Sequence, residues 1–239
     1  MCRIFAFYIT YNYKLKQMLS FFKDYKIFGI VFLILSIIII SIIYNTLNVY
    51  QPLPIYQPAM VSTELVDSTI QYQKKYHKIA NFKLINKNGK PITQNDYKDK
   101  IYVADFFFTT CQTICPIMTN HMADIQKEIL NDNDVMLLSH TVTPEIDTVA
   151  QLKRYAVKKG VIDTKWNLVT GDKKQIYELA RKSYLAVKNF GDGGAFDMIH
   201  TENFMLIDKK RQIRGFYDGT DADDISRLLD DIEILKKEK

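Results

Sequence analysis

The chain has 239 residues, of which 47% are hydrophobic and 25% charged, and it contains only 3 cysteines. These values exclude a disordered tail, a collagen and a disulfide-dense miniprotein, and the length allows one or two domains. The net charge of +5 lies mostly in residues 1–26, where five basic side chains and one acidic side chain give 5 − 1 = +4. Residues 27–44 carry no charge, so residues 45–239 have a net charge of only +1. Without a basic face, the chain is not expected to bind nucleic acid.

The first predicted element is an apolar helix. Ile27–Tyr44 contains no charged residue, and at 1.5 Å per residue it extends over about 27 Å, close to the thickness of a hydrocarbon core. A cleaved signal peptide would have a shorter apolar region and an Ala-x-Ala-like cleavage site, which residues 45–49 do not offer. The pattern therefore favours an uncleaved membrane anchor.

The flanking charges predict the orientation of this anchor. Lys23 and Lys26 lie on its N-terminal side, and basic residues stay in the cytoplasm. We therefore expect a cytoplasmic tail at 1–26, a single-pass anchor at 27–47 in a bacterial inner membrane, and a periplasmic remainder. Met18 is an alternative start of the chain.

A stalk and one globular domain follow the anchor. Residues 48–76 contain three prolines and no clear periodicity, which is typical of a stalk, and 77–239 are long enough for one core. The domain begins with a predicted β-hairpin, in which Phe82–Ile85 and Lys90–Thr93 flank a turn at Asn86–Gly89.

Strands then alternate with helices. Ile101–Phe108 is almost continuously apolar, as expected of a strand covered on both faces. The later predicted elements are a helix at 117–130, a strand at 135–142, a helix at 148–159 ended by Gly160, a strand at 166–169, a helix at 173–184, strands at 204–207 and 213–217, and a helix from Asp223. This order predicts an α/β three-layer sandwich with a mixed central sheet.

A cysteine pair lies on the turn after the first buried strand. Cys111 and Cys115 would close almost no loop as a structural disulfide, so we expect a metal-binding or redox-active pair. Pro116 favours the first helical position, which would make Cys115 the N-cap, and the helix terminus would favour thiolates there. Two thiolates suit Cu(I), or they could form a disulfide. Met118 and Met122 fall on the apolar stripe of the helix and are expected in the core.

A stable copper site needs a third ligand, and the chain has 4 histidines. His121 lies on another face of the helix, His77 is expected to be solvent-exposed, and His140 reads as a polar residue at the end of a strand. His200 follows a glycine-rich segment at 190–199 and precedes a strand. A mobile loop there could deliver an imidazole to the cysteines, so His200 is the best candidate among the histidines.

Three segments together resemble a known family. They are Phe106–Thr119 (FFFTTCQTICPIMT), Thr143–Thr148 (TPEIDT) and Asp197–His200 (DMIH). They resemble the SCO/SenC/PrrC family of copper proteins, and the resemblance extends over roughly 79–237. It implies a thioredoxin-like fold behind a membrane anchor.

The resemblance also implies a site and a function. The site would hold Cu(I), Cu(II) or both through Cys111, Cys115 and His200. The function would be assembly of the copper centre of cytochrome c oxidase, by copper delivery or by keeping the target cysteines reduced. The partner would be the copper-bearing oxidase subunit or another periplasmic copper or thiol protein. The family usually has Pro-Asp where this chain has Gln112-Thr113, which removes a rigid turn and a carboxylate from beside the thiolates. The alternative function is a periplasmic thiol–disulfide oxidoreductase, an enzyme in which Cys111 and Cys115 form the catalytic redox pair.

Overall fold

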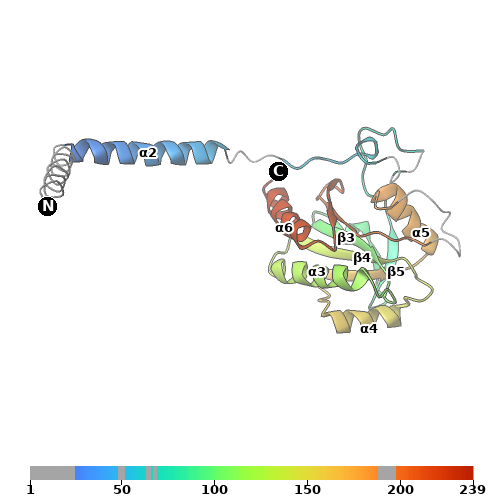
Figure 1. The fold of residues 1–239 in the computed structure, drawn as a ribbon. Coiled ribbons are helices and arrows are strands. Elements are labelled where there is room, and N and C mark those ends of the chain that lie inside the picture. The colour runs from blue at the N-terminus through green and yellow to red at the C-terminus, as the bar shows by residue number, and fades with distance from the viewer. Residues whose placement is uncertain (1–24, 48–51, 63–65, 67–68, 188–197, 239) are drawn as a thin grey trace, which may run out of the picture. The chain divides into compact units, whose positions relative to one another are not determined.

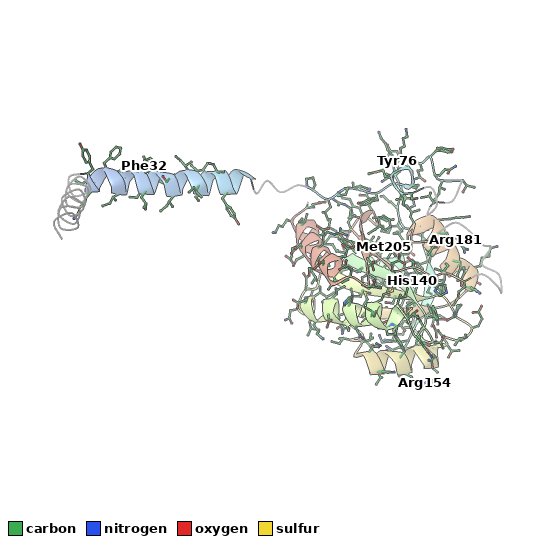
Figure 2. The ribbon with its side chains drawn as sticks, viewed as in Figure 1. Phe32, Tyr76, His140, Arg154, Arg181 and Met205 are labelled. Carbon is green, nitrogen blue, oxygen red and sulfur yellow. The ribbon has the colours of Figure 1, made fainter. Side chains whose placement is uncertain are left out.

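A computed structural model describes residues 25–47, 52–62, 66, 69–187 and 198–238 (Figure 1). The chain divides into two compact units, residues 1–51 and 52–239. In the first unit, α2 (Lys26–Leu47) contains the predicted anchor. Its segment Lys26–Tyr44 has a mean hydropathy of 3.0 and is not buried against other residues, as Figure 2 shows for Phe32. By length and composition, this helix can cross a membrane.

The second unit is built on a seven-stranded mixed sheet with the order β2-β1-β5-β4-β3-β6-β7. The strands are β1 (Lys83–Asn86), β2 (Pro91–Thr93), β3 (Ile101–Phe107), β4 (Val135–Thr141), β5 (Trp166–Thr170), β6 (Asn203–Ile207) and β7 (Ile213–Asp218). β3, β4 and β5 are parallel, and the other pairings are antiparallel. The predicted mixed sheet and the predicted hairpin of β1 and β2 are confirmed.

Helices cover both faces of the sheet (Figure 1). Residues of α3 (Cys115–Glu128), α4 (Val149–Lys159) and α6 (Ala222–Lys237) share one core cluster with the strands. The opposite cluster contains residues of α5 (Lys173–Glu178), η3 (Leu179–Ser183) and the segment before β1. All seven residues of β3 are buried, because this central strand is covered on both sides. The three-layer α/β sandwich is therefore the observed fold.

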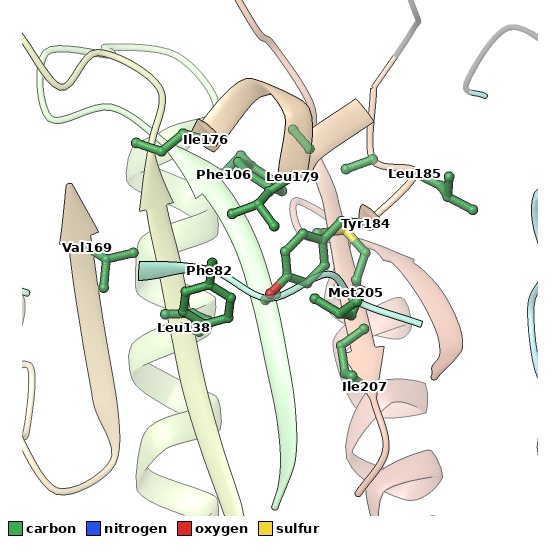
Figure 3. Close-up of a cluster of buried hydrophobic side chains, with 14 of the residues drawn as sticks. Phe82, Phe106, Leu138, Val169, Ile176, Leu179, Tyr184, Leu185, Met205 and Ile207 are labelled. Carbon is green, nitrogen blue, oxygen red and sulfur yellow. The ribbon is translucent and has the colours of Figure 1, made fainter. Parts of the chain in front are cut away.

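Figure 3 shows the second cluster in detail. Phe106 and Leu138 project from neighbouring parallel strands, and Leu179 and Tyr184 close over them from the helical side. Alternate residues of the same strands point to the other cluster, where Val103 and Phe107 pack with α3. A two-sided core of this kind requires the apolar runs seen in the sequence.

Local signals explain most of the element boundaries. Gly89 has a φ of 75° in the hairpin turn, and Gly160 ends α4 with a φ of 68°, a conformation that glycine adopts without strain. Thr148 caps α4 by accepting a hydrogen bond from the backbone of Gln151. The helix predicted to reach Tyr184 is different: α5 ends at Glu178, and a π-helical turn follows in which Tyr184 N donates to Leu179 O.

The described residues of the predicted stalk, from 52 onward, are part of the second unit and pack against its other residues. Arg214 is buried and donates to the carbonyl oxygens of Leu53 at 2.6 Å and Pro54 at 3.1 Å.

His77 was expected in solvent, but it is 5% exposed. Its Nε2 donates to the carbonyl oxygen of Ser183 at 2.8 Å, and this buried bond to a distant segment corrects the prediction of an exposed His77.

Candidate metal centre

The two cysteines lie where β3 passes into α3. Cys115 is the first residue of α3, and Ile114 occupies the N-cap position. Ile114 already has helical dihedral angles, φ −82° and ψ −38°, and its carbonyl oxygen accepts hydrogen bonds from the backbones of Ile117 and Met118. The prediction that Cys115 is the N-cap is therefore wrong by one residue.

The two thiols are free and differ in environment. Cys111 is partly exposed, and desolvation opposes its ionisation. Hydrogen bonds outweigh this effect and lower the pKa of Cys111 to about 7. They come from the Thr113 hydroxyl, from the backbones of Cys115 and Thr113 and from the Cys115 thiol. Cys115 is 3% exposed, and burial raises the pKa of its thiol to about 12. The expectation that the helix terminus favours thiolate is thus wrong for Cys115, because desolvation exceeds the helix dipole.

Polar groups lie near Cys115. The Thr119 hydroxyl donates to the Cys115 carbonyl oxygen at 2.7 Å and lies 2.8 Å from the Tyr155 hydroxyl. Asp105 on β3 is 1% exposed, and burial raises the pKa of its carboxyl to about 7. Its Oδ1 has no hydrogen-bond partner in the described chain. Asp105 was not among the residues predicted for the site, although an acidic residue inside an apolar strand is a usable signal.

His200 lies next to residues 109–115, the cysteine segment. Its exposed imidazole contacts the Phe108 ring edge-on, with 5.5 Å between the ring centroids. The carbonyl oxygen of Phe108 accepts a hydrogen bond from Cys111 N at 3.3 Å, so Phe108 joins the histidine to the cysteines. No three His, Cys, Asp or Glu side chains among the described residues are close enough to hold a metal. The structure therefore brings the two cysteines together and places His200 one contact away.

The chain near His200 is held at one carbonyl group. The Thr201 hydroxyl donates to the Ala186 oxygen at 2.8 Å, and the Asn203 side chain donates to the same oxygen at 3.2 Å. The predicted mobile segment, 190–199, lies mostly outside the described residues, which resume at Met198. His200 is thus one residue from a side chain that is hydrogen-bonded to the Ala186 carbonyl oxygen.

The other histidines and methionines weighed as ligands, His121, His140, Met118 and Met122, are held by core packing or by a hydrogen bond. His140, labelled in Figure 2, is fully buried, and its ring stacks on Phe106 with 4.8 Å between the ring centroids. Burial lowers the pKa of His140 to about 4. His121 Nδ1 bonds the carbonyl oxygen of Gly219 at 2.8 Å. The two methionines of the stripe on α3 have no exposed surface, which confirms that Met118 and Met122 belong to the core.

Most of the globular unit matches one known protein family. The model of the SCO1/SenC family matches residues 70–236. The chain belongs to the SCO1/SenC family. A SCO1 protein homologue of Bacillus subtilis (strain 168) is 32% identical over 159 residues, which cover 66% of this chain and 82% of the homologue. The family resemblance and the thioredoxin-like fold are therefore confirmed.

Solved structures of this family share the fold. BsSco, described as having a disulfide switch and as a member of the Sco family of cytochrome c oxidase assembly proteins, is 32% identical, covers 68% of this chain and 95% of its own, and has a TM-score of 0.59. A SCO1/SenC family lipoprotein from Bacillus anthracis str. Ames is 31% identical, with a TM-score of 0.60 and coverage of 69% and 99%. The structure of Bradyrhizobium japonicum ScoI, 23% identical with a TM-score of 0.53 and coverage of 67% and 99%, holds copper. The SCO1/SenC family thus includes copper-binding proteins and proteins of cytochrome c oxidase assembly.

The two thiols are expected to differ sharply in reactivity. In a Cys2→Ser background, iodoacetamide at pH 7.5 should label Cys111 at least about 100-fold faster than Cys115, because only the thiolate reacts and only Cys111 is substantially ionised. The rate at Cys111 should rise with pH around a midpoint near 7. Peptide mass spectrometry over time gives both rates. Equal rates at the two cysteines would contradict the assigned environments.

Proposed function

We propose that this chain binds copper through Cys111, Cys115 and His200 and delivers it to the copper-bearing subunit of cytochrome c oxidase. The observation that carries the proposal is the pair of free thiols on the turn into α3, together with the exposed His200 imidazole, which contacts Phe108 just before that turn. Thiolate sulfur and imidazole nitrogen are the donors that copper prefers in proteins. The copper-bound relatives make the same cargo reasonable for this member of the family.

The partly formed site suits a carrier. A delivery protein must release its metal, and a ligand on a separate segment can leave the metal before the cysteines do. His200 lies on the chain that precedes β6, and its contact is with Phe108. Copper would draw the imidazole toward the thiolates, and transfer to the target would reverse that movement.

A second function is favoured by the asymmetry of the thiols. Cys111, with a pKa of about 7, has the character of an attacking thiolate, and the buried Cys115 that of a resolving thiol. In such a reaction Cys111 attacks a disulfide of the target, and Cys115 then attacks the mixed disulfide and gives its proton to solvent. The target leaves as a dithiol, and the chain becomes a disulfide. This thiol–disulfide oxidoreductase needs no histidine.

The proposed location is a bacterial inner membrane, with α2 as a single-pass anchor and the globular unit in the periplasm. The exposed apolar surface of α2 and the lysines on its N-terminal side support this orientation. A reporter that becomes active only after export should be active when it is fused after Lys239. Activity of a cytoplasm-only reporter at the same position would reverse the orientation and remove the basis for a role in oxidase assembly.

Copper transfer tests the main proposal. The full chain, purified in detergent and reduced, is loaded with one equivalent of Cu(I) and mixed with the copper-free soluble domain of the oxidase subunit, first with its cysteines reduced and then with them oxidised. We expect copper to move to the reduced target while the chain keeps both thiols. The opposite result would be no copper transfer to the reduced target together with reduction of the oxidised target. That result would contradict copper delivery and favour the oxidoreductase function.

A further inference from the structure

A buried carboxylate joins the cysteine segment to the neighbouring loop. Asp147 precedes α4 and has no exposed surface. Its Oδ1 accepts a hydrogen bond from the Thr109 hydroxyl at 2.5 Å, and its Oδ2 accepts from the Thr109 backbone N–H at 3.1 Å. Oδ2 also accepts from the hydroxyls of Thr141 at 2.5 Å and Thr143 at 3.1 Å. One side chain thus joins Thr109, two residues before Cys111, to the end of β4 and the loop that follows it.

The donors of this cluster make Asp147 difficult to replace. A carboxylate without contact to water is stable only when hydrogen-bond donors surround it, and here three hydroxyls and one amide supply them. An asparagine would keep the shape, but it offers one oxygen and turns an NH₂ group toward donors. The cluster therefore depends on a charged acceptor at position 147.

Thr109 carries this restraint to the cysteines. It lies two residues before Cys111, and both its backbone and its hydroxyl bond Asp147. The Gln151 side chain of α4 also donates to the Thr109 hydroxyl, at 2.9 Å. At the other end of the segment, Cys115 is fixed as the first residue of α3. The Cys111 backbone thus lies between an anchored threonine and an anchored helix.

We propose that Asp147 is a positioning residue for the cysteine pair. By holding Thr109, it sets how closely Cys111 approaches Cys115, and so determines how readily the two sulfurs form a disulfide or bind one copper ion. The role in copper binding rests on the proposed function, whereas the role in disulfide formation does not. Two thiols held near each other have a high effective concentration, and loosening one of them lowers it.

The disulfide equilibrium measures this positioning without copper. In glutathione buffers, the dithiol of the full chain and one oxidised glutathione give the internal disulfide and two reduced glutathiones, a transfer of two electrons. In a Cys2→Ser background in detergent, Thr109→Val should lower the equilibrium constant for disulfide formation about tenfold, equivalent to about 30 mV. Asp147→Asn should lower it at least as much, and both variants should weaken Cu(I) binding.

Thr141→Val is the matched control. The hydroxyls of Thr109 and Thr141 each donate to Asp147 at 2.5 Å, and each accepts one further hydrogen bond, from Gln151 and from the backbone of Thr143 respectively. Both substitutions remove one hydroxyl from the same carboxylate, so both should lower thermal stability similarly. Only Thr109 lies in the cysteine segment, and the Thr141→Val equilibrium constant should stay within about twofold of wild type.

The comparison decides the inference even if Asp147→Asn does not fold. Equal shifts of the disulfide equilibrium in Thr109→Val and Thr141→Val, or no shift in either, would overturn the positioning role and leave a purely structural one. A shift in Thr109→Val alone supports it. If the wild-type chain bound no copper while this difference persisted, the proposed function would fail and the positioning role of Asp147 would stand.

Discussion

Replacing Cys111 or Cys115 with serine will abolish copper binding by the reduced chain. A serine hydroxyl is a hard, neutral donor at neutral pH and cannot replace a soft thiolate as a ligand of Cu(I). The wild-type chain should bind about one Cu(I), and each variant should bind it more than about 100-fold more weakly, since loss of an outer partner of a metal ligand alone costs 10–100-fold. Competition with a Cu(I) chelator, followed by metal analysis, measures the affinities.

The chain supplies its own control for this experiment. Cys2→Ser makes the same chemical change outside the Cys-x-x-x-Cys motif and should leave copper binding intact. Serine is nearly the size of cysteine, so the far-ultraviolet circular dichroism of all three variants should match that of wild type. Stoichiometric copper in a Cys111→Ser, Cys115→Ser double variant would show that other groups hold the metal.

Elements with local signals could be predicted from the sequence. The apolar run at 101–108 became β3, all of which is buried, and the turn at Asn86–Gly89 joins β1 to β2. Gly160 ends α4 as expected. Each of these elements depends on residues within one turn or one strand of each other, and such patterns are readable without the rest of the chain.

Features that depend on distant contacts could not be predicted. His77 is buried because it bonds Ser183, 106 residues away, and because its backbone donates to the Gln57 side chain. The π-helical turn at Leu179–Ser183 interrupts a pattern that otherwise favours a continuous helix. No local propensity encodes either feature, since tertiary packing decides both.

The candidate site shows the same division. The cysteines are recognisable because their spacing and the following proline lie within one short segment. His200 was the best candidate among the histidines because it follows a glycine-rich segment and precedes a strand, and the family resemblance supported it. The four donors around Asp147 come from Thr109, from Thr141 at the end of β4 and from Thr143 just after it, and no spacing rule points to them. The high pKa of Cys115 follows from burial, which the sequence position at a helix start does not reveal.

Replacing His200 with alanine will separate copper binding from thiol chemistry. The change removes the only imidazole that the described structure places against Phe108, beside the cysteine segment. Cu(II) prefers nitrogen donors more than Cu(I) does, so Cu(II) affinity should fall by more than about 100-fold and Cu(I) affinity by less. The disulfide equilibrium of Cys111 and Cys115 should change little, because sulfur exchange needs only the two thiols.

His121→Ala is the control for removal of an imidazole elsewhere. His121 bonds Gly219 rather than the cysteine segment, so this variant should bind Cu(I) and Cu(II) with the affinities of wild type. In cells at limiting copper, His200→Ala should lose oxidase activity and regain part of it when copper is added, because a weakened carrier is helped by more cargo. If the His200→Ala strain assembled its oxidase normally at limiting copper, delivery would not be the task, and the cysteine pair would act as a reductant of the target.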